Sequence, residues 1–134
     1  LDRTGIVHAV SGFLLERGGN IVNVSSIAGL EGQAYSAGYC AAKHGLIGLT
    51  RAMAMEFTGK SLRVNAICPG GMMTPQVTGF TFPDGVDFDL VMKVASPRGL
   101  MEAEDVAKMV AFVASDDAAA IHGAVYSVDN GKMA

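Results

Sequence analysis

Tyr39 and Lys43 are two side chains that can pass a proton to or from a reacting oxygen. Both fall in residues 37–57, whose length and composition predict a long helix, and residues four apart in a helix lie on one face. A phenol ionises only at about pH 10, but a neighbouring ammonium stabilises the phenolate. The pair therefore predicts acid/base chemistry on a carbonyl or alcohol oxygen. A Tyr-x-x-x-Lys spacing also arises by chance, so a solvated surface pair is the alternative.

Two further segments carry groups that could complete such a site. Ser26 ends the β-branched run 20–26, which predicts a buried strand, and its hydroxyl could hold a substrate oxygen beside the phenol. Residues 69–74 (PGGMMT) follow a second predicted strand, and their glycines would let a ligand approach the backbone. Each feature also has a simpler interpretation. Ser26 could only satisfy backbone groups at the strand end, and residues 69–74 could form an ordinary turn.

The elements that must position these groups alternate along a single domain of 134 residues. Helices are expected over 1–17, 37–57, 88–95 and 102–114, strands over 20–26, 62–68 and 123–129, and a loop over 74–87. Such alternation with short joints predicts an α/β fold, a parallel sheet flanked by helices. The strands are nearly continuous apolar runs, as expected for a sheet covered on both faces.

The composition argues against several other classes of protein. Half of the residues are hydrophobic, 17% are charged and the net charge is −3, which excludes a disordered chain and gives no basic patch for nucleic acid. No apolar run reaches the roughly 18 residues that cross a bilayer, and the start LDRTGIVHAV lacks the pattern of a secretion signal. Cys40 and Cys68 form no disulfide framework, so free thiols of a cytoplasmic protein are expected.

Taken together, these stretches resemble the short-chain dehydrogenase/reductase family. The resemblance lies in NIVNVSSIAG (20–29), YCAAK (39–43) and RVNAICPGG (63–71) with Thr74, and the end SDDAAAIHGAVYSVDNG (115–131) is also similar. It covers essentially the whole chain, in the right order and spacing. The resemblance implies a Rossmann-like, doubly wound parallel sheet. It also implies hydride transfer between NAD or NADP and the carbon of a small-molecule alcohol or ketone.

The resemblance also implies a role for each candidate residue. Tyr39 would be the general acid/base, Lys43 would favour its phenolate and bind the nicotinamide ribose, and Ser26 would orient and polarise the substrate oxygen. The nicotinamide carboxamide would be contacted by Pro69, Gly70, the Met72 backbone and the Thr74 side chain. Residues 75–98 would form the substrate loop, with Phe80, Phe82 and Met92 as candidate apolar contacts or simple packing residues.

The sequence departs from the family pattern in three places. It has no TGxxxGxG turn and no residue that would select NAD or NADP, and about three of the family's seven strands are expected. The start LDRTG has no Asn where N-x-T-G is usual, so no proton-relay residue is assigned, and Asn130 stands where glycine is common. We therefore expect the C-terminal catalytic part of such an enzyme, with the N-terminal cofactor half absent. The alternative is a catalytically silent, truncated chain that acts only as an interaction module.

Small residues gather near one face of the helix expected over 37–57. They are Gly38, Ala41, Gly45, Gly48 and Ala52. Because each interior glycine costs a helix about 1 kcal/mol relative to alanine, another backbone is expected to approach this face. The resemblance implies a homo-oligomer, dimer or tetramer, that packs through this helix. The alternative is that the glycines pack only on their own sheet.

Hydrolase and metal sites are poorly supported by the sequence. Ser26 and His44 could suggest a hydrolase, but no G-x-S-x-G elbow surrounds the serine. His8, His44 and His122 lie far apart in the chain and are expected to be surface or capping residues. Neither cysteine belongs to a C-x-x-C pair, so no metal is expected.

Overall fold

The computed structural model describes residues 18–79 and 81–134, so the helix expected over 1–17, with His8, and the candidate contact Phe80 lie outside the described residues. The strands are β1 (Gly19–Val24), β2 (Leu62–Pro69) and β3 (Val125–Val128). The helical segments are η1 (Ile27–Gly29), α2 (Ala37–Glu56), α3 (Pro75–Thr78), α4 (Phe88–Met92), α5 (Ala103–Ala114) and η2 (Asp116–Ala118).

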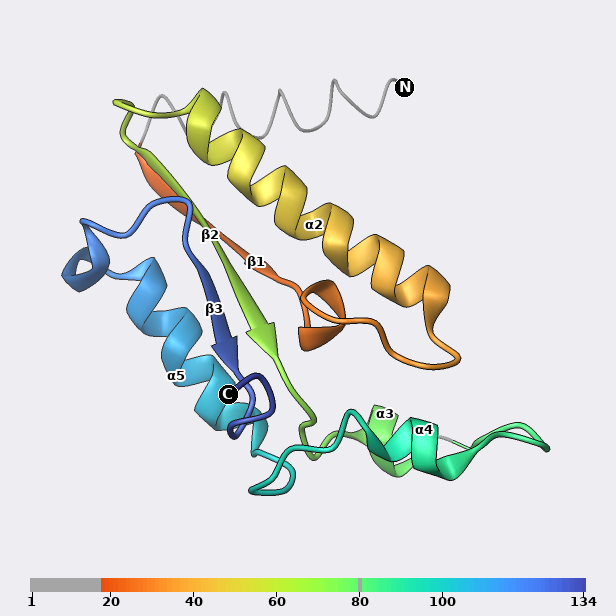
Figure 1. Ribbon diagram of the computed structural model, residues 1–134. Coiled ribbons are helices and arrows are strands. Elements are labelled where there is room, and N and C mark those ends of the chain that lie inside the picture. The colour runs from red at the N-terminus through yellow and green to blue at the C-terminus, as the bar shows by residue number, and fades with distance from the viewer. Residues whose placement is uncertain (1–17, 80) are drawn as a thin grey trace.

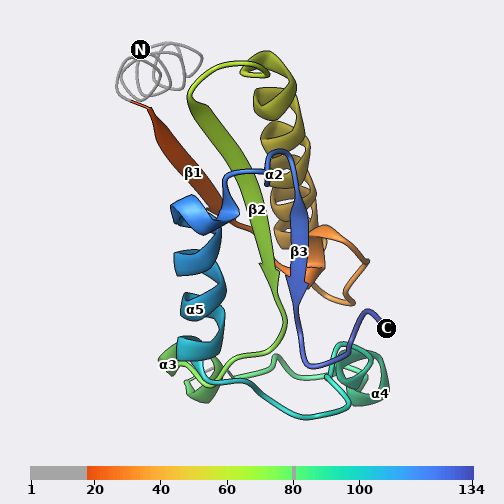
Figure 2. The ribbon, with the colours of Figure 1, turned by 90° about the vertical axis from the view of Figure 1, so that its left-hand side faces the viewer.

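The three strands form a parallel sheet in the order β1-β2-β3, which confirms the predicted α/β fold. Pairing runs from Gly19 opposite Leu62 to Val24 opposite Ile67 along β1 and β2. The long helix α2 covers one face of the sheet and α5 covers the other (Figures 1 and 2). The result is a Rossmann-like arrangement of three layers, in which β1 pairs with β2 alone among the described strands.

Alternate residues of the central strand β2 face the two helices. Leu62 and Val64 join a buried cluster with Met53 and Ala54 of α2. Ile67 joins a second cluster on the opposite face, packed with Met101, Val106 and Val113. A strand buried on both faces needs apolar side chains at nearly every position, which explains the run LRVNAICP.

Several element boundaries differ from the expected ones. The strand expected to reach Ser26 ends at Val24, because Ser26 caps η1 instead. The loop expected over 74–87 is wrong at its start: α3 begins at Pro75, the first helical position, where a missing N–H costs little. The helix expected over 88–95 ends at Met92. None of the described helices combines the length and apolar character needed to cross a membrane.

Candidate functional site

The candidate residues collect at one edge of the sheet, where the strands end. Ser26 follows β1, residues 70–74 follow β2, and Tyr39 lies in the first turn of α2, which begins at the same edge (Figure 1). The segment with α3 and α4 extends beyond this edge (Figure 1). In open parallel sheets this carboxyl edge is where ligands bind.

Lys43 is held between the end of β1 and the ring of Tyr39. Its Nζ donates a hydrogen bond to the Val24 carbonyl at 3.0 Å and lies 5.6 Å from the centroid of the Tyr39 ring. The Ser25 hydroxyl donates to the Lys43 carbonyl at 2.9 Å, which fixes the backbone of the same residue. Tyr39 and Lys43 therefore share one face of α2, as their spacing predicts, and the ammonium lies in cation–π range of the phenol.

Ser26 has a definite local role at the end of β1. Its Oγ accepts a hydrogen bond from the Ala28 amide at 3.1 Å, so it caps η1. Ser25 and Ser26 thus both satisfy backbone groups, which is the simpler interpretation of the strand end. Because Oγ of Ser26 is an acceptor in this bond, its O–H group retains the ability to donate to a further oxygen.

Gly29, which is not among the residues predicted for the site, explains how closely η1 approaches α2. A Cβ at Gly29 would lie 2.7 Å from the Ser25 Oγ and 2.8 Å from the Lys43 carbonyl oxygen. Only glycine leaves room for this contact. Its signal in the sequence is a glycine three residues after the capping serine, at a position with an ordinary backbone conformation.

The two glycines after β2 pack closely against neighbouring segments. A Cβ at Gly70 would lie 2.9 Å from the Cα of Asp129, and one at Gly71 would lie 2.7 Å from the Cδ2 of Leu100. The Asp129 backbone at Gly70 and the Leu100 side chain at Gly71 therefore occupy the space that a side chain would need. Substitution of Gly70 would therefore displace the backbone, whereas at Gly71 a shift of the Leu100 side chain could make room.

The backbone N–H and C=O groups of Met72 face away from the neighbouring described segment. Met101 donates its amide to the Gly71 carbonyl at 3.0 Å and accepts from the Met73 amide at 2.8 Å. In this parallel bridge the N–H and C=O of Met72 itself point away from Met101. The described part of the chain thus leaves a donor and an acceptor side by side at Met72.

The segment expected to bind substrate exposes apolar side chains. The rings of Phe82 and Phe88 pack edge to face with centroids 5.2 Å apart, and Met92 is 61% exposed. Tyr35, which is not among the predicted site residues, connects this segment to the loop before α2, because its hydroxyl accepts a hydrogen bond from the Asp87 amide at 3.0 Å. Tyr35 has a left-handed backbone, φ 61°, a conformation that is uncommon for residues other than glycine.

A hollow of about 470 Å³ lies at the opposite end of the sheet. It is lined by Gly18, Gly19, Asn20, Lys60, Ser61, Arg63, Asp116 and Ala119. None of the candidate catalytic residues lines it. The chemical case for the site therefore rests on the groups that meet at the carboxyl edge.

The two thiols differ in accessibility. Cys68 is buried beneath the Ser25–Ser26 turn, and burial raises the pKa of its thiol above the ordinary value of 9.0, against opposing hydrogen bonds from the Ser26 backbone and the Ser25 side chain. Cys40 on α2 is partly exposed. We expect Ellman's reagent to modify Cys40 in the native protein and Cys68 only after denaturation, because the thiolate reacts and needs access.

A Cys40→Ser variant leaves Cys68 as the single cysteine for this measurement. Its single cysteine should stay unmodified at neutral pH for as long as the protein remains folded. Folding disfavours the Cys68 thiolate, because burial raises the pKa of this thiol. We therefore also expect the free energy of unfolding to fall as the pH rises above about 9. Rapid modification of the native variant would contradict the buried placement of Cys68.

Comparison with known proteins defines the class to which this fold and site belong. The family model described as enoyl-(acyl carrier protein) reductase matches residues 4–132. The chain belongs to the short-chain dehydrogenase/reductase family, as the motifs around Ser26, Tyr39 and residues 63–74 indicate.

Individual members of this family are similar to the chain over most of its length. It is 43% identical over 136 aligned positions to the short-chain dehydrogenase/reductase aba4 of Botryotinia fuckeliana, with 98% of the chain and 53% of the relative covered. It is 41% identical over 122 positions to a cyclohexanol dehydrogenase of Acinetobacter sp. (strain SE19), with 91% and 46% covered. The chain thus spans about half the length of the curated relatives it matches.

Solved structures show the same fold. A 4-hydroxyisoleucine dehydrogenase complexed with NADH matches with a TM-score of 0.77 and 31% identity, covering 95% of this chain and 52% of that one. A variant of the actinorhodin polyketide ketoreductase with NADPH matches with a TM-score of 0.76 and 32% identity, covering 90% and 50%. Both neighbours are enzymes bound to a nicotinamide cofactor.

Proposed function

We propose that this chain carries the acid/base site of an NAD- or NADP-dependent oxidoreductase that interconverts an alcohol and a ketone. One observation carries the proposal: the Lys43 ammonium is bound to the Val24 carbonyl and lies over the Tyr39 ring, at the carboxyl edge of the sheet. Dehydrogenases and a ketoreductase among the relatives support the same reaction class.

The residues present fit a nicotinamide cofactor. The N–H and C=O of Met72, which point away from Met101, match the acceptor and donor of a primary carboxamide, and Thr74 lies two residues further along the same extended segment. An ammonium has three donors, and Lys43 uses one on Val24, which leaves two for ribose hydroxyls. Pro69 and Gly70 complete the proposed cofactor-binding set. When bound, the nicotinamide accepts or supplies the hydride.

The protein's own groups handle the proton. In the reduction direction the Tyr39 hydroxyl gives its proton to the substrate oxygen, and in the oxidation direction the phenolate takes a proton from the alcohol. The Lys43 ammonium stabilises the phenolate through its positive charge. The Ser26 hydroxyl, held at the cap of η1, donates a hydrogen bond to the same substrate oxygen and fixes its position.

The proposed substrate is a small alcohol or ketone with an apolar body. The segment 75–98 exposes Val77, Phe82, Phe88 and Met92 beyond the carboxyl edge. Apolar side chains of this kind favour a hydrocarbon ring or chain over a strongly charged molecule.

Titration of the purified protein with NADH and NADPH, followed by the nicotinamide fluorescence, tests the proposal. We expect saturable binding of one of the two and hydride transfer in a panel that includes cyclohexanone and cyclohexanol. The competing candidate is a catalytically silent module that acts only through self-association. That candidate predicts no saturable binding of either nucleotide, together with a stable oligomer.

We also propose that α2 packs against α2 of a second copy. A Cβ built at Gly38, Gly45 or Gly48 meets no described atom within 4 Å, which supports a partner on this face over packing on the chain's own sheet. Leu49 beside them is 41% exposed and Met55 is 77% exposed. An exposed face of small residues lets two helices approach closely, which supports a homo-oligomer.

Substitution of Gly48 tests this interface through two effects of opposite sign. Within one chain, Gly48→Leu should stabilise α2 by roughly 0.5–1 kcal/mol, because leucine favours helices and no described atom obstructs it. In the oligomer the same side chain should weaken association about 10- to 100-fold through overpacking. Sedimentation velocity against concentration measures this, with Gly32→Ala in an open loop position as the control. An unchanged oligomer would refute the interface.

A further inference from the structure

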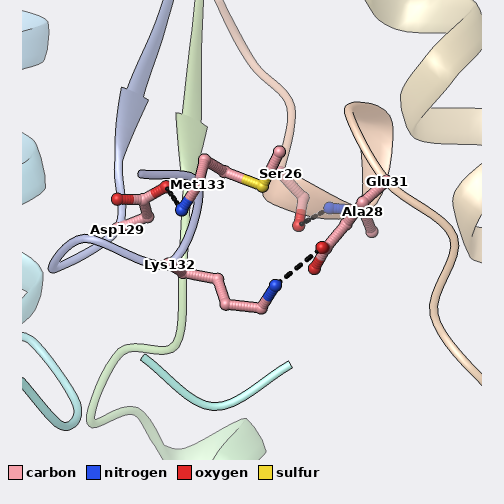
Figure 3. A network of polar contacts seen from close by, with 6 residues as sticks. All are labelled: Ser26, Ala28, Glu31, Asp129, Lys132 and Met133. Carbon is pink, nitrogen blue, oxygen red and sulfur yellow. Dashed lines mark hydrogen bonds and ion pairs between the residues drawn. The ribbon is translucent and has the colours of Figure 1, made fainter. Parts of the chain in front are cut away.

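The last residues of the chain form a compact turn built around Asp129. This side chain is buried, its Oδ1 accepts from the Gly131 amide at 3.0 Å and its Oδ2 from the Met133 amide at 3.1 Å (Figure 3). The Lys132 amide closes the turn on the Asp129 carbonyl at 3.2 Å. Asn130 takes a left-handed backbone, φ 54°, which asparagine tolerates better than most residues. The C-terminal turn, residues 129–133, therefore has a fixed shape of its own.

An ion pair joins this C-terminal turn to the segment that Ser26 caps. Lys132 Nζ lies 2.7 Å from Glu31 Oε2, with the two side chains only 16% and 23% exposed (Figure 3). The exposed pair Lys108–Asp105, at 76% and 54%, is far more open to water and to screening. The second carboxylate oxygen of Glu31 is buried and has no partner among the described residues, within which Lys132 is the cation that pairs with this carboxylate.

The Glu31 end of the ion pair belongs to the turn that holds the proposed catalytic serine. The Glu31 amide donates to the Ile27 carbonyl at 3.0 Å, and the Gly29 amide donates to the Ser26 carbonyl at 2.9 Å. In Figure 3 the side chains of Ser26, Glu31 and Lys132 are drawn together, with the C-terminal turn on one side and η1 on the other. A displacement of Glu31 is therefore transmitted to Ser26 through one short, buried helical turn.

The C-terminal turn also touches two other parts of the site. The Gly70 amide donates to the Val128 carbonyl at 2.9 Å, and Gly70 packs against Asp129 with no room for a Cβ. The Asn130 Nδ2 donates to the Gly99 carbonyl at 3.1 Å, at the end of the substrate segment. Asn130, which stands where glycine is common in the family, thereby makes a side-chain contact that glycine lacks.

We propose that Glu31 and Lys132 are positioning residues that hold Ser26 at a fixed distance from the cofactor-binding segment, with the C-terminal turn as the rigid link between them. This inference rests on the proposed function of Ser26. The serine must bind the same oxygen that Tyr39 protonates, and a misplacement of about 1 Å costs up to about 100-fold in rate. The link keeps Ser26 and residues 70–74 in a fixed relative position.

Replacement of Lys132 tests the inference in the whole protein. We expect Lys132→Gln to lower kcat about 10- to 100-fold while the KM for cofactor changes little, because the cofactor-binding residues stay in place. Amide hydrogen exchange at Gly29 and Leu30, whose N–H groups close η1, should become faster in the same variant. Lys132→Arg preserves the charge and should restore both readouts. Lys108→Gln removes the exposed pair and should change neither.

Hydrogen exchange separates failure of this inference from failure of the proposed function. A wild-type protein without turnover would refute the function, and faster exchange at Gly29 and Leu30 would still establish the link. Unchanged exchange in Lys132→Gln, or a loss of kcat that Lys132→Arg does not repair, would overturn the inference. If Lys132→Gln does not fold, the isosteric Glu31→Gln variant removes the same ion pair without the uncompensated carboxylate, and the same two readouts decide.

Discussion

Tyr39→Phe in the whole protein is expected to lower kcat about 100- to 10,000-fold, the range that a positioned general acid or base supplies. The substitution removes only the hydroxyl. Because the Tyr39 ring is 48% exposed and the ring itself provides the contact with Lys43, the fold and the position of the ammonium should be unchanged. Steady-state turnover with the preferred cofactor, together with the thermal unfolding midpoint, measures both effects.

A second tyrosine provides the matched control. Tyr126 lies in β3 and packs against the buried cluster of Ile67 and Val113, so Tyr126→Phe removes a hydroxyl without touching the proposed site. Its kcat should stay close to that of the wild type. Unchanged turnover in Tyr39→Phe would refute the acid/base role. A cofactor affinity that collapses with kcat would instead assign Tyr39 to binding.

The sequence predicted the parts of this molecule that depend on local periodicity. The β-branched runs around Val22 and Val64 indicated strands, and the spacing of Tyr39 and Lys43 placed both on one helical face, where the structure has them. These inferences work because strand and helix repeats are fixed by backbone geometry. The carboxyl edge followed from the parallel order of the strands, since ligand-binding segments then meet at one end.

The remaining features depend on contacts between residues far apart in the chain. Spacing alone could not show that Lys132 meets Glu31, 101 positions away, or that the Tyr35 hydroxyl binds the Asp87 amide. The glycines show the same limit. A glycine has the same sequence signal whether its space is filled by another segment, as at Gly70, or is open to a partner, as at Gly48.

Arg63 is a charged residue whose long-range contacts the sequence could not show, and it stands in a central strand that is apolar apart from itself and Asn65. Its guanidinium donates to the carbonyls of Val113 and Ile121 at 3.1 Å and to that of Ser115 at 2.8 Å. The acceptors lie at the C-terminal end of α5 and in the connection to β3, where helix carbonyls lack partners and a positive charge is favourable. One side chain therefore closes the end of the helix that covers the second face of the sheet.

Arg63→Met is accordingly expected to lower the free energy of unfolding by about 2–4 kcal/mol, the cost of leaving carbonyls without their charged donor. The loss should reach the site, because α5 follows Met101, and Met101 pairs with the Met72 segment. Urea unfolding measures the stability, and cofactor affinity measures the transmitted effect. The control Arg51→Met, at an exposed position of α2, should stay within about 0.5 kcal/mol of the wild type. Equal stabilities of the two variants would show that the three hydrogen bonds of Arg63 do not hold α5 against the sheet.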